Sequence, residues 1–214
     1  MHLKRKAMPK NWQLPRKTKK YIVKSNPGQN MNYSLPCLLI LRDVLGLVKT
    51  TREAKIILKE GNIYVNNKKI NSEKFSIGLF DRLYIKKEEK YFTITLDKHG
   101  LKVIEISEKD AGVKPIKVIG KKLLKNKKIQ INCFDGRNFI YDKEIRVGDS
   151  ILIDLKENKI LKILSLKEGS DAFILFGNHK GRVGKIEKIE KENAILKFGD
   201  EKSKVKLNNI YIIN

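Results

Sequence analysis

Hydrophobic residues follow two different periods along this chain, and the first of them predicts a pair of short helices. Leu38, Leu41 and Leu45 recur at helical spacing and would form one apolar stripe. Ser34-Leu35-Pro36 precedes them and suits a helix start, because serine can cap free amides and proline is tolerated in a first turn. Gly46 is then expected to end the helix.

A second helix is predicted directly after the first. Thr50 and Glu53 have the spacing of a capping box, in which each side chain bonds the other residue's backbone amide. Ala54, Ile57 and Leu58 would form its apolar face. Gly61 is a natural end for this helix, since glycine readily adopts the left-handed conformation found there.

Alternation with a period of two predicts strands over most of the remaining chain. Asn66-Asn67 and Asp135-Gly136 are turn signals between pairs of such strands. The predicted strands are 62–65, 68–70, 82–85, 128–134, 139–141, 151–153 and 160–166. Cys133 falls within this pattern and is interpreted as a core residue without chemistry of its own.

Residues 1–36 show neither period. They hold four of the five prolines, and such a segment buries too little apolar surface to offset its ordering entropy, so alone it should be disordered. Trp12 and Tyr21 stand among its basic residues and offer faces on which unpaired bases can stack. We expect a basic arm that folds on RNA, and a solvated tail is the alternative.

Together the patterns predict an α+β chain of four parts. These are an extended arm at 1–36, a helix-and-sheet domain at 37–95, a central β domain at 96–169 and a small β-barrel at 170–214. Each folded part has a size at which hydrophobic cores are marginal. Binding to a partner should therefore add stability.

The charge indicates what that partner is. The net charge is +23, and residues 1–36 contain nine lysines and arginines but no acidic residue. A charge of this size implies a polyanion as partner. No run of about 18 apolar residues and no signal-peptide core is present, which excludes a membrane-spanning segment and favours a cytoplasmic protein. Cys37 and Cys133 are far apart, so neither a disulfide framework nor a cysteine metal site is expected.

Basic residues also gather on one face of the second predicted helix. Arg52, Lys55 and Lys59 are spaced i, i+3 and i+7, away from the apolar stripe. Arg42 and Lys49 lie just before the helix start, where free amides and the helix dipole favour an anion. This corner is predicted to bind phosphate, and a solvated charged face is the alternative.

This second part resembles the S4-type RNA-binding domain. The similarity rests on Arg42-Asp43, Thr51-Arg52-Glu53-Ala54, Gly61 and Val65-Asn66, and it extends through Asp81 to Ile85. The resemblance implies two short helices packed on a small sheet, with the helical face binding structured RNA.

The last segment resembles the KOW motif of small SH3-like barrels. Its sequence from Phe173 to Ile186 places Gly177, Gly181 and Gly184 around a loop. Lys180, Arg182 and Lys185 make that loop basic, and His179 would hydrogen-bond RNA or cap the loop. An ordinary glycine-rich hairpin is the alternative.

In their order, these parts resemble one family, the archaeal and eukaryotic small-subunit ribosomal proteins S4e. Trp12, Ser34-Leu35-Pro36, Leu41-Arg42-Asp43 and Phe134-Asp135-Gly136 are similar to phrases of that family. The resemblance implies a structural protein that binds small-subunit rRNA beside neighbouring ribosomal proteins, without a cofactor, metal or small-molecule substrate. The RNA-binding residues that we predict are Lys4, Arg5, Lys6, Lys10, Trp12, Arg16, Lys17, Lys19, Lys20, Arg42, Lys49, Thr51, Arg52, Lys55, Lys59, Lys68, Lys69, His179, Lys180, Arg182 and Lys185.

Two other functions fit the sequence less well. An RNA-modifying enzyme would need a catalytic group, but Gly136-Arg137-Asn138 lacks the aspartate of a pseudouridine synthase and no glycine-rich cofactor loop occurs. The three histidines have no neighbouring triad or metal-ligand pattern. An RNA-binding factor outside the ribosome, of elongation or heat-shock type, fits the domains but explains the basic arm less well.

Overall fold

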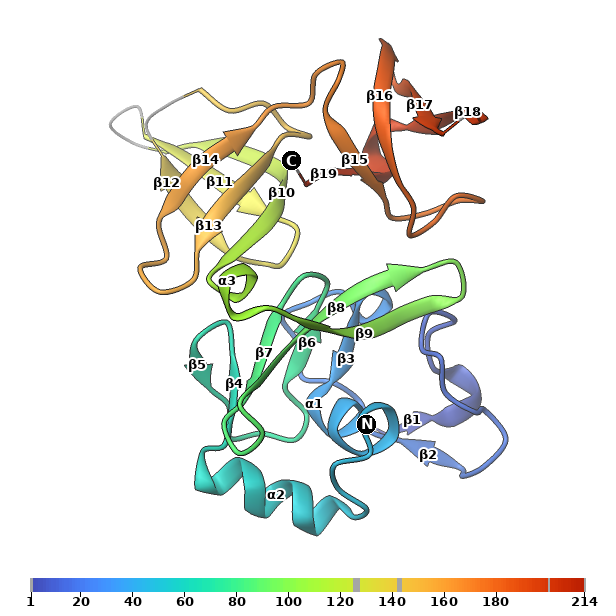
Figure 1. Cartoon of the computed structure of the whole chain (residues 1–214), viewed down its shortest axis with the longest axis vertical. Helices are drawn as coiled ribbons and strands as arrows, with labels where there is room; N and C mark the ends of the chain where they lie inside the picture. Colours follow the sequence, from blue (N-terminus) through green and yellow to red (C-terminus); the bar gives the residue numbers. More distant parts are fainter. Residues whose placement is uncertain (1, 125–127, 142–143, 200, 214) are drawn as a thin grey trace. The chain divides into compact units, whose positions relative to one another are not determined.

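The computed structural model describes residues 2–124, 128–141, 144–199 and 201–213. The chain forms two compact units, Met1–Gly112 and Val113–Asn214, and each is described here by itself (Figure 1). The boundary predicted at residue 95 falls inside strand β8 (Lys90–Asp97), which pairs along its length with β9 (Gly100–Ile106). The first unit therefore continues past this hairpin instead of ending at it.

The first unit begins its helical part with a buried turn. Strand β3 (Ser34–Pro36) leads into α1 (Cys37–Leu39), which continues as a π-helical turn over Ile40–Val44. Pro36 is the N-cap, so the prediction that Ser34 caps this helix was wrong. Ser34 instead lies in β3 and accepts a hydrogen bond from the hydroxyl of Ser76, 2.8 Å away. Residues 37–41 are all buried, so the segment is apolar on every side.

Helix α2 (Thr51–Glu60) forms as predicted. Thr50 and Glu53 make the reciprocal capping box, and Gly61 ends the helix in the left-handed conformation with φ of 78°. Ala54 and Leu58 are buried. The local signals at both ends of this helix are therefore sufficient to place it.

A five-stranded antiparallel sheet completes the first unit, in the order β5-β4-β7-β8-β9. Asn66 and Asn67 both have positive φ, which is the geometry of a tight hairpin turn between β4 and β5. Strand β6 pairs separately with β3, and helix α3 follows β9. The remaining bounds are β4 (Ile63–Val65), β5 (Lys68–Lys69), β6 (Ser76–Gly78), β7 (Arg82–Ile85) and α3 (Glu108–Ala111).

The arm is folded against this unit, contrary to the prediction that it is disordered by itself. Strands β1 (Leu3–Lys4) and β2 (Tyr21–Ile22) pair with each other. Trp12 is only 2% exposed, and its indole nitrogen donates hydrogen bonds to the carbonyls of Ser34, at 2.9 Å, and Met31, at 3.1 Å. Trp12 is thus a core residue, and the prediction that it stacks on RNA bases was wrong. Its hydrogen-bond partners lie 19 and 22 residues away in sequence, which is why sequence period alone did not reveal its buried role.

The second unit contains two five-stranded antiparallel sheets. The first has the order β12-β11-β10-β13-β14, and the second has the order β18-β17-β16-β15-β19. Each sheet has an apolar cluster, and Leu164 of the first sheet contributes to the cluster of the second. The strands of the first sheet are β10 (Val113–Leu123), β11 (Ile129–Cys133), β12 (Asn138–Tyr141), β13 (Ser150–Asp154) and β14 (Ile160–Leu164). Those of the second are β15 (Asp171–Ile174), β16 (Val183–Glu190), β17 (Asn193–Phe198), β18 (Glu201–Lys206) and β19 (Ile210–Ile212).

Buried polar groups join the two sheets of this unit. Lys117 in β10 donates from its ammonium to the carbonyls of Leu207, Asn208 and Ile210, at 3.1, 2.9 and 2.6 Å. The Tyr211 hydroxyl donates to the carbonyl of Pro115 at 2.8 Å. The last strand is therefore held to the first sheet as well as to its own.

The described chain is mostly β structure, with its longest helix in the first unit. No helix among the described residues is long and apolar enough to cross a membrane. Cys37 and Cys133 are both buried, and burial raises the pKa of each thiol to about 12. Cys133 is a core residue of the first sheet of unit 2, as predicted.

Candidate nucleic-acid interface

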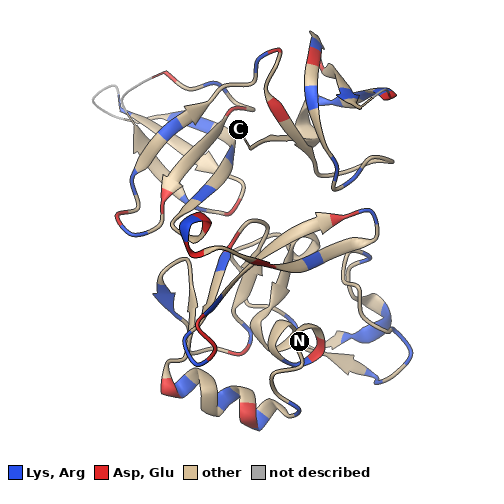
Figure 2. Ribbon diagram, in the orientation of Figure 1, with Lys and Arg blue, Asp and Glu red and all other residues tan. Residues whose placement is uncertain are grey.

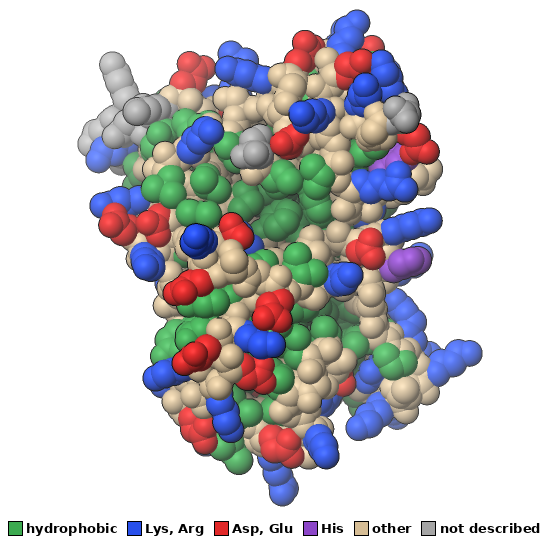
Figure 3. Space-filling model, viewed as in Figure 1, with side chains coloured by type: hydrophobic (Ala, Val, Ile, Leu, Met, Phe, Trp, Pro, Cys, Tyr) green, Lys and Arg blue, Asp and Glu red, His purple; other side chains and the backbone are tan. Residues whose placement is uncertain are grey.

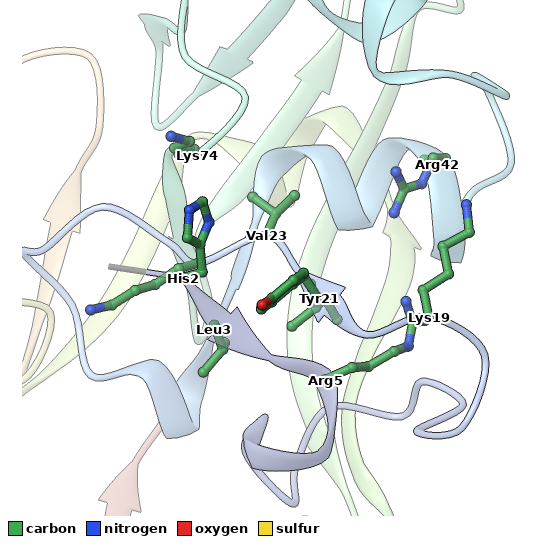
Figure 4. A pocket seen from close by; sticks show the side chains of 10 residues that line it. His2, Leu3, Arg5, Lys19, Tyr21, Val23, Arg42 and Lys74 are labelled. Carbon is green, nitrogen blue, oxygen red and sulfur yellow. The ribbon is translucent and has the colours of Figure 1, made fainter.

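Two adjoining hollows in the first unit bring the arm together with the segment that precedes α2. One has a volume of about 320 Å³ and the other about 520 Å³, and Arg5, Lys19 and Arg42 line both. We call the two hollows together the arm groove. In Figure 4, these three side chains lie at one end of the smaller hollow, His2 and Lys74 lie at the other, and Tyr21 lies between them.

The arm groove is strongly electropositive. Its ionised lining residues are six cations and one acid: Arg5, Lys19, Lys24, Arg42, Lys49 and Lys74, with Asp43. The ribbon of the arm carries basic positions without acidic ones (Figure 2). In the space-filling view, basic side chains protrude over much of the visible face (Figure 3). Grouping like charges is unfavourable unless an anion offsets them, so the groove is suited to a polyanion.

Individual contacts shape the groove. Arg5, which was predicted to bind RNA, is only 5% exposed, and its Nε donates to the Pro15 carbonyl at 2.6 Å, so it braces the groove instead of facing solvent. Arg42 forms a bidentate pair with Asp43, at 2.8 and 3.2 Å. Partly exposed ion pairs of this kind contribute only about 0–1 kcal/mol. Arg42 can therefore exchange its carboxylate for a phosphate at low cost.

The basic face of α2 is present as predicted, and at its N-terminus the Glu53 carboxylate caps two backbone amides. Arg52, Lys55 and Lys59 are exposed, and Lys55 lies 3.5 Å from the Glu73 carboxylate. At the helix start, the Glu53 carboxylate accepts hydrogen bonds from the backbone amides of Lys49, at 2.8 Å, and Thr50, at 3.4 Å.

These contacts also lower the pKa of Glu53, chiefly through the Lys49 amide. The Glu53 carboxylate thus satisfies these two amides, Thr51 is half-buried, and phosphate binding by the Arg42 and Lys49 side chains stays a prediction. The remaining RNA-facing candidates on this helix are its exposed side chains.

The hairpin lysines differ from each other in their surroundings. Lys68 and Lys69 are both exposed on β5. The Lys69 side chain passes close over Gly61, where a β-carbon would collide with it. Lys69 therefore lies against the C-terminal end of α2, where a cation is favoured by the helix dipole.

The other predicted arm residues divide by role. Lys4, Lys6, Lys10, Lys17 and Lys20 are exposed. Arg16 instead donates to the carbonyls of Lys6 and Pro9, both at 3.1 Å, and so braces the arm internally. The predicted set omitted Lys24 and Lys74. The sequence shows Lys24 as one more cation of the arm. Lys74 is distant from the arm in sequence, and only folding makes it a lining residue of the groove.

The basic loop of the second unit joins β15 to β16. It is closed by hydrogen bonds from the Gly181 amide to the Ile174 carbonyl, at 2.8 Å, and from the Lys180 amide to the Gly177 carbonyl, at 3.2 Å. Gly177 and Gly181 have positive φ, as a tight loop requires. Arg182 and Lys185 are exposed, and Arg182 lies 3.4 Å from the Glu201 carboxylate.

His179 in this loop has a packing role. Its ring stacks on Phe198 with 5.1 Å between centroids and 9° between planes. A β-carbon on Gly184 would lie 2.6 Å from the same Phe198 ring, so that glycine makes room for it. Phe176, which was not predicted as a site residue, is 65% exposed beside the loop.

Comparisons with known proteins were made for the whole chain. The sequence models of two families match, "Ribosomal family S4e" over residues 88–160 and the "RS4NT (NUC023) domain" over residues 1–28. A small ribosomal subunit protein eS4 from Methanospirillum hungatei is 39% identical over 189 residues, which cover 86% of this chain and 78% of the relative. The chain belongs to the ribosomal protein family S4e.

Further members agree with this assignment. The eS4 protein of Methanosphaera stadtmanae is 36% identical, covering 94% of this chain and 87% of its own. The crystal structure of 30S ribosomal protein S4e from Thermoplasma acidophilum superposes with a TM-score of 0.74 at 30% identity, covering 85% of this chain and 95% of that one. The predicted S4e resemblance is thus confirmed, and with it a structural ribosomal role instead of an enzymatic one.

Proposed function

We propose that this S4e chain, as a structural constituent of the small ribosomal subunit, binds small-subunit rRNA along the arm groove and the exposed face of α2. The observation that carries the proposal is the lining of the groove, where six cations meet one acid. Lysines and arginines that neutralise several phosphates together release bound counterions, which is the main driving force of such binding.

The folded arm supports this proposal. Trp12 anchors the arm to the carbonyls of Met31 and Ser34, so the groove cations are positioned before RNA arrives. Side chains already held in place lose less conformational entropy on binding. Arg5, which is braced by Pro15, illustrates this advantage within the groove.

The second unit is proposed to add a separate contact. Its last sheet and the loop around Lys180 have the glycine and cation arrangement of a KOW element, and we assign residues 170–214 to an SH3-like barrel of that kind. Exposed Arg182 and Lys185 would bind phosphates there, and Arg182 would leave its Glu201 partner to do so. His179 would support the loop through Phe198 and would not contact bases.

The location and partners of the chain follow from this role. It would reside on cytoplasmic ribosomes, beside neighbouring small-subunit proteins, and would need no cofactor or small-molecule substrate. Residues 1–36 would act as the rRNA-binding arm, the rest of the first unit through Gly112 as the S4-type domain, and residues 113–169 as a central spacer domain.

A paired charge reversal tests the proposal. Lys19→Glu with Arg42→Glu should weaken binding of the purified chain to small-subunit rRNA by at least about tenfold, because phosphate contacts are lost and repulsion is added. The control is Lys87→Glu with Lys98→Glu, which makes the same charge change at exposed positions outside the groove. Equal losses in both double variants, with both chains folded by circular dichroism, would refute the groove as the binding site.

A further inference from the structure

The smaller hollow of the arm groove contains more than cations. Its floor includes the apolar residues Leu3, Ile22 and Val23, and the ring of Tyr21 stands in it, 48% exposed (Figure 4). Ile22, the next residue along β2, is buried in the core, so alternation along the strand turns Tyr21 outward. A phosphate chain would use the cations of this pocket but not its exposed aromatic ring. The pocket therefore suits a more specific ligand, which also contacts the ring.

The surroundings of Tyr21 are all neutral or basic. The His2 ring lies 5.6 Å from the Tyr21 ring, and the Lys20 ammonium lies 5.5 Å from its centroid. Lys19, Lys24, Arg42 and Lys74 form the rim, and the buried Arg5 also lines the hollow. Among the described residues, no Asp or Glu lines this hollow. The pocket thus combines a stacking surface with cations on two sides of it.

We propose that this pocket binds one unpaired nucleotide of rRNA, with its base stacked on Tyr21 and its flanking phosphates on Lys19 and Arg42. Unpaired bases are recognised in this way, by stacking on aromatic side chains beside a cationic path for the backbone. The volume of about 320 Å³ is at the lower limit of small-ligand pockets, which suits a single nucleotide. A paired base is already stacked within its helix and cannot use the Tyr21 ring.

The proposal rests on the proposed rRNA-binding function but makes a separate claim about Tyr21. Free inorganic phosphate would need only the rim and would leave the ring unused. An acidic peptide would also satisfy the rim, and it is the main competing occupant. The experiment must therefore distinguish single-stranded RNA from duplex RNA and from acidic peptide.

Tryptophan fluorescence of the full chain provides that test. In Tyr21→Trp, the new indole is exposed, whereas Trp12 is buried and supplies a constant background. A ten-nucleotide single-stranded RNA should quench the added emission, and a duplex of equal phosphate concentration should quench it far less. Equal quenching by the duplex, no quenching by either RNA, or quenching by a deca-glutamate peptide alone would overturn the proposal.

Affinity measurements separate this claim from the general one. Tyr21→Leu should weaken single-strand binding at least about fivefold, whereas Tyr21→Phe should retain it, since stacking requires only the ring. Tyr64→Leu, at a half-exposed tyrosine outside the groove, is the matched control. Unchanged affinity in Tyr21→Leu, with an unshifted Trp12 emission maximum, would overturn the nucleotide pocket. The Lys19 and Arg42 reversal would still test the groove independently.

Discussion

At the scale of single residues, Trp12 is the strongest attachment of the arm. Its side chain combines nearly complete burial with hydrogen bonds to two backbone carbonyls. Trp12→Phe keeps most of the apolar contact but leaves these carbonyls without their donor, which should cost about 1–3 kcal/mol. Urea unfolding followed by circular dichroism should show a lower midpoint than in the parent chain. An unchanged midpoint would mean that the arm adds nothing to the stability of the unit.

Lys117 predicts a pH dependence in the second unit. Burial lowers its pKa from the ordinary value of 10.5 to about 8. Between these two pH values, the unfolded chain binds a proton that the folded chain has released, so the free energy of unfolding should rise as the pH rises from 8. Below pH 8, both states are protonated and this contribution is constant.

The Lys117→Met variant isolates this effect. It retains an apolar stem but cannot titrate, so subtracting its unfolding curve from that of the parent removes the other titrating groups. The free energy of unfolding of the parent minus that of the variant should increase as the pH rises above 8. A difference that is flat with pH would contradict the assignment to Lys117.

Single residues also show which parts of the site a sequence can reveal. The exposed cations of α2 were predictable because helical spacing alone places them on one face. The pairing of Arg42 with Asp43 and the hydrogen bond from Arg16 to the Lys6 carbonyl are side-chain contacts, which sequence spacing does not predict. The buried position of Trp12 is not predictable from the sequence, because an isolated aromatic residue gives no period and its carbonyl partners lie far along the chain.

At the scale of elements, the β8–β9 hairpin acts as a support for the arm. The Leu101 amide donates to the Asn11 carbonyl at 2.8 Å, and a β-carbon on Gly100 would collide with that same carbonyl. Gly100 also has φ of 152°, a conformation that favours glycine. Gly100→Ala should therefore displace the arm while the sheet remains folded.

The Gly100→Ala displacement has a direct readout. Trp12, the only tryptophan, should move from a buried to a wetter environment, so its emission should shift to longer wavelength. Gly112→Ala is a control, because no atom lies within 4 Å of the added carbon there. A shift of equal size in both variants, or none in Gly100→Ala, would contradict the account of arm docking.

Elements with strong local signals were predicted well. The capping box of α2, the Asn66-Asn67 turn and the Asp135-Gly136 turn each define their own geometry within a few residues. The start of α1 was misplaced because Ser34 finds a tertiary partner, Ser76, that outcompetes its capping role. The boundary predicted at residue 95 lies inside β8, and the pairing of β8 with β9 is a tertiary contact that local signals do not reveal.

At the scale of the whole molecule, charge should dominate RNA affinity. If the five groove cations other than the buried Arg5 neutralise about five phosphates, the logarithm of Kd should rise with the logarithm of salt concentration at a slope of about 4. The Lys19→Glu and Arg42→Glu double variant should lower this slope by about 2. Filter binding over a salt series measures both values, and a flat response would exclude an electrostatic interface.

The overall charge was predictable from composition, but its location was only partly so. The basic arm was evident because nine cations stand in residues 1–36 without an acid. That Lys49 and Lys74 join the arm cations in one groove depends on the docking of the arm, which in turn depends on Trp12 and Gly100. Family membership identifies the assembly, whereas the groove is a proposal about where this chain holds its RNA.

Lysine labelling of the free chain and of the assembled small subunit tests that proposal most directly. Groove lysines Lys19, Lys24, Lys49 and Lys74 are exposed in the isolated chain and should react with an acetylating reagent there. In the subunit, they should be protected strongly, and more than Lys87 and Lys98 outside the groove. Groove lysines that react in the subunit as fast as in the free chain would contradict the account.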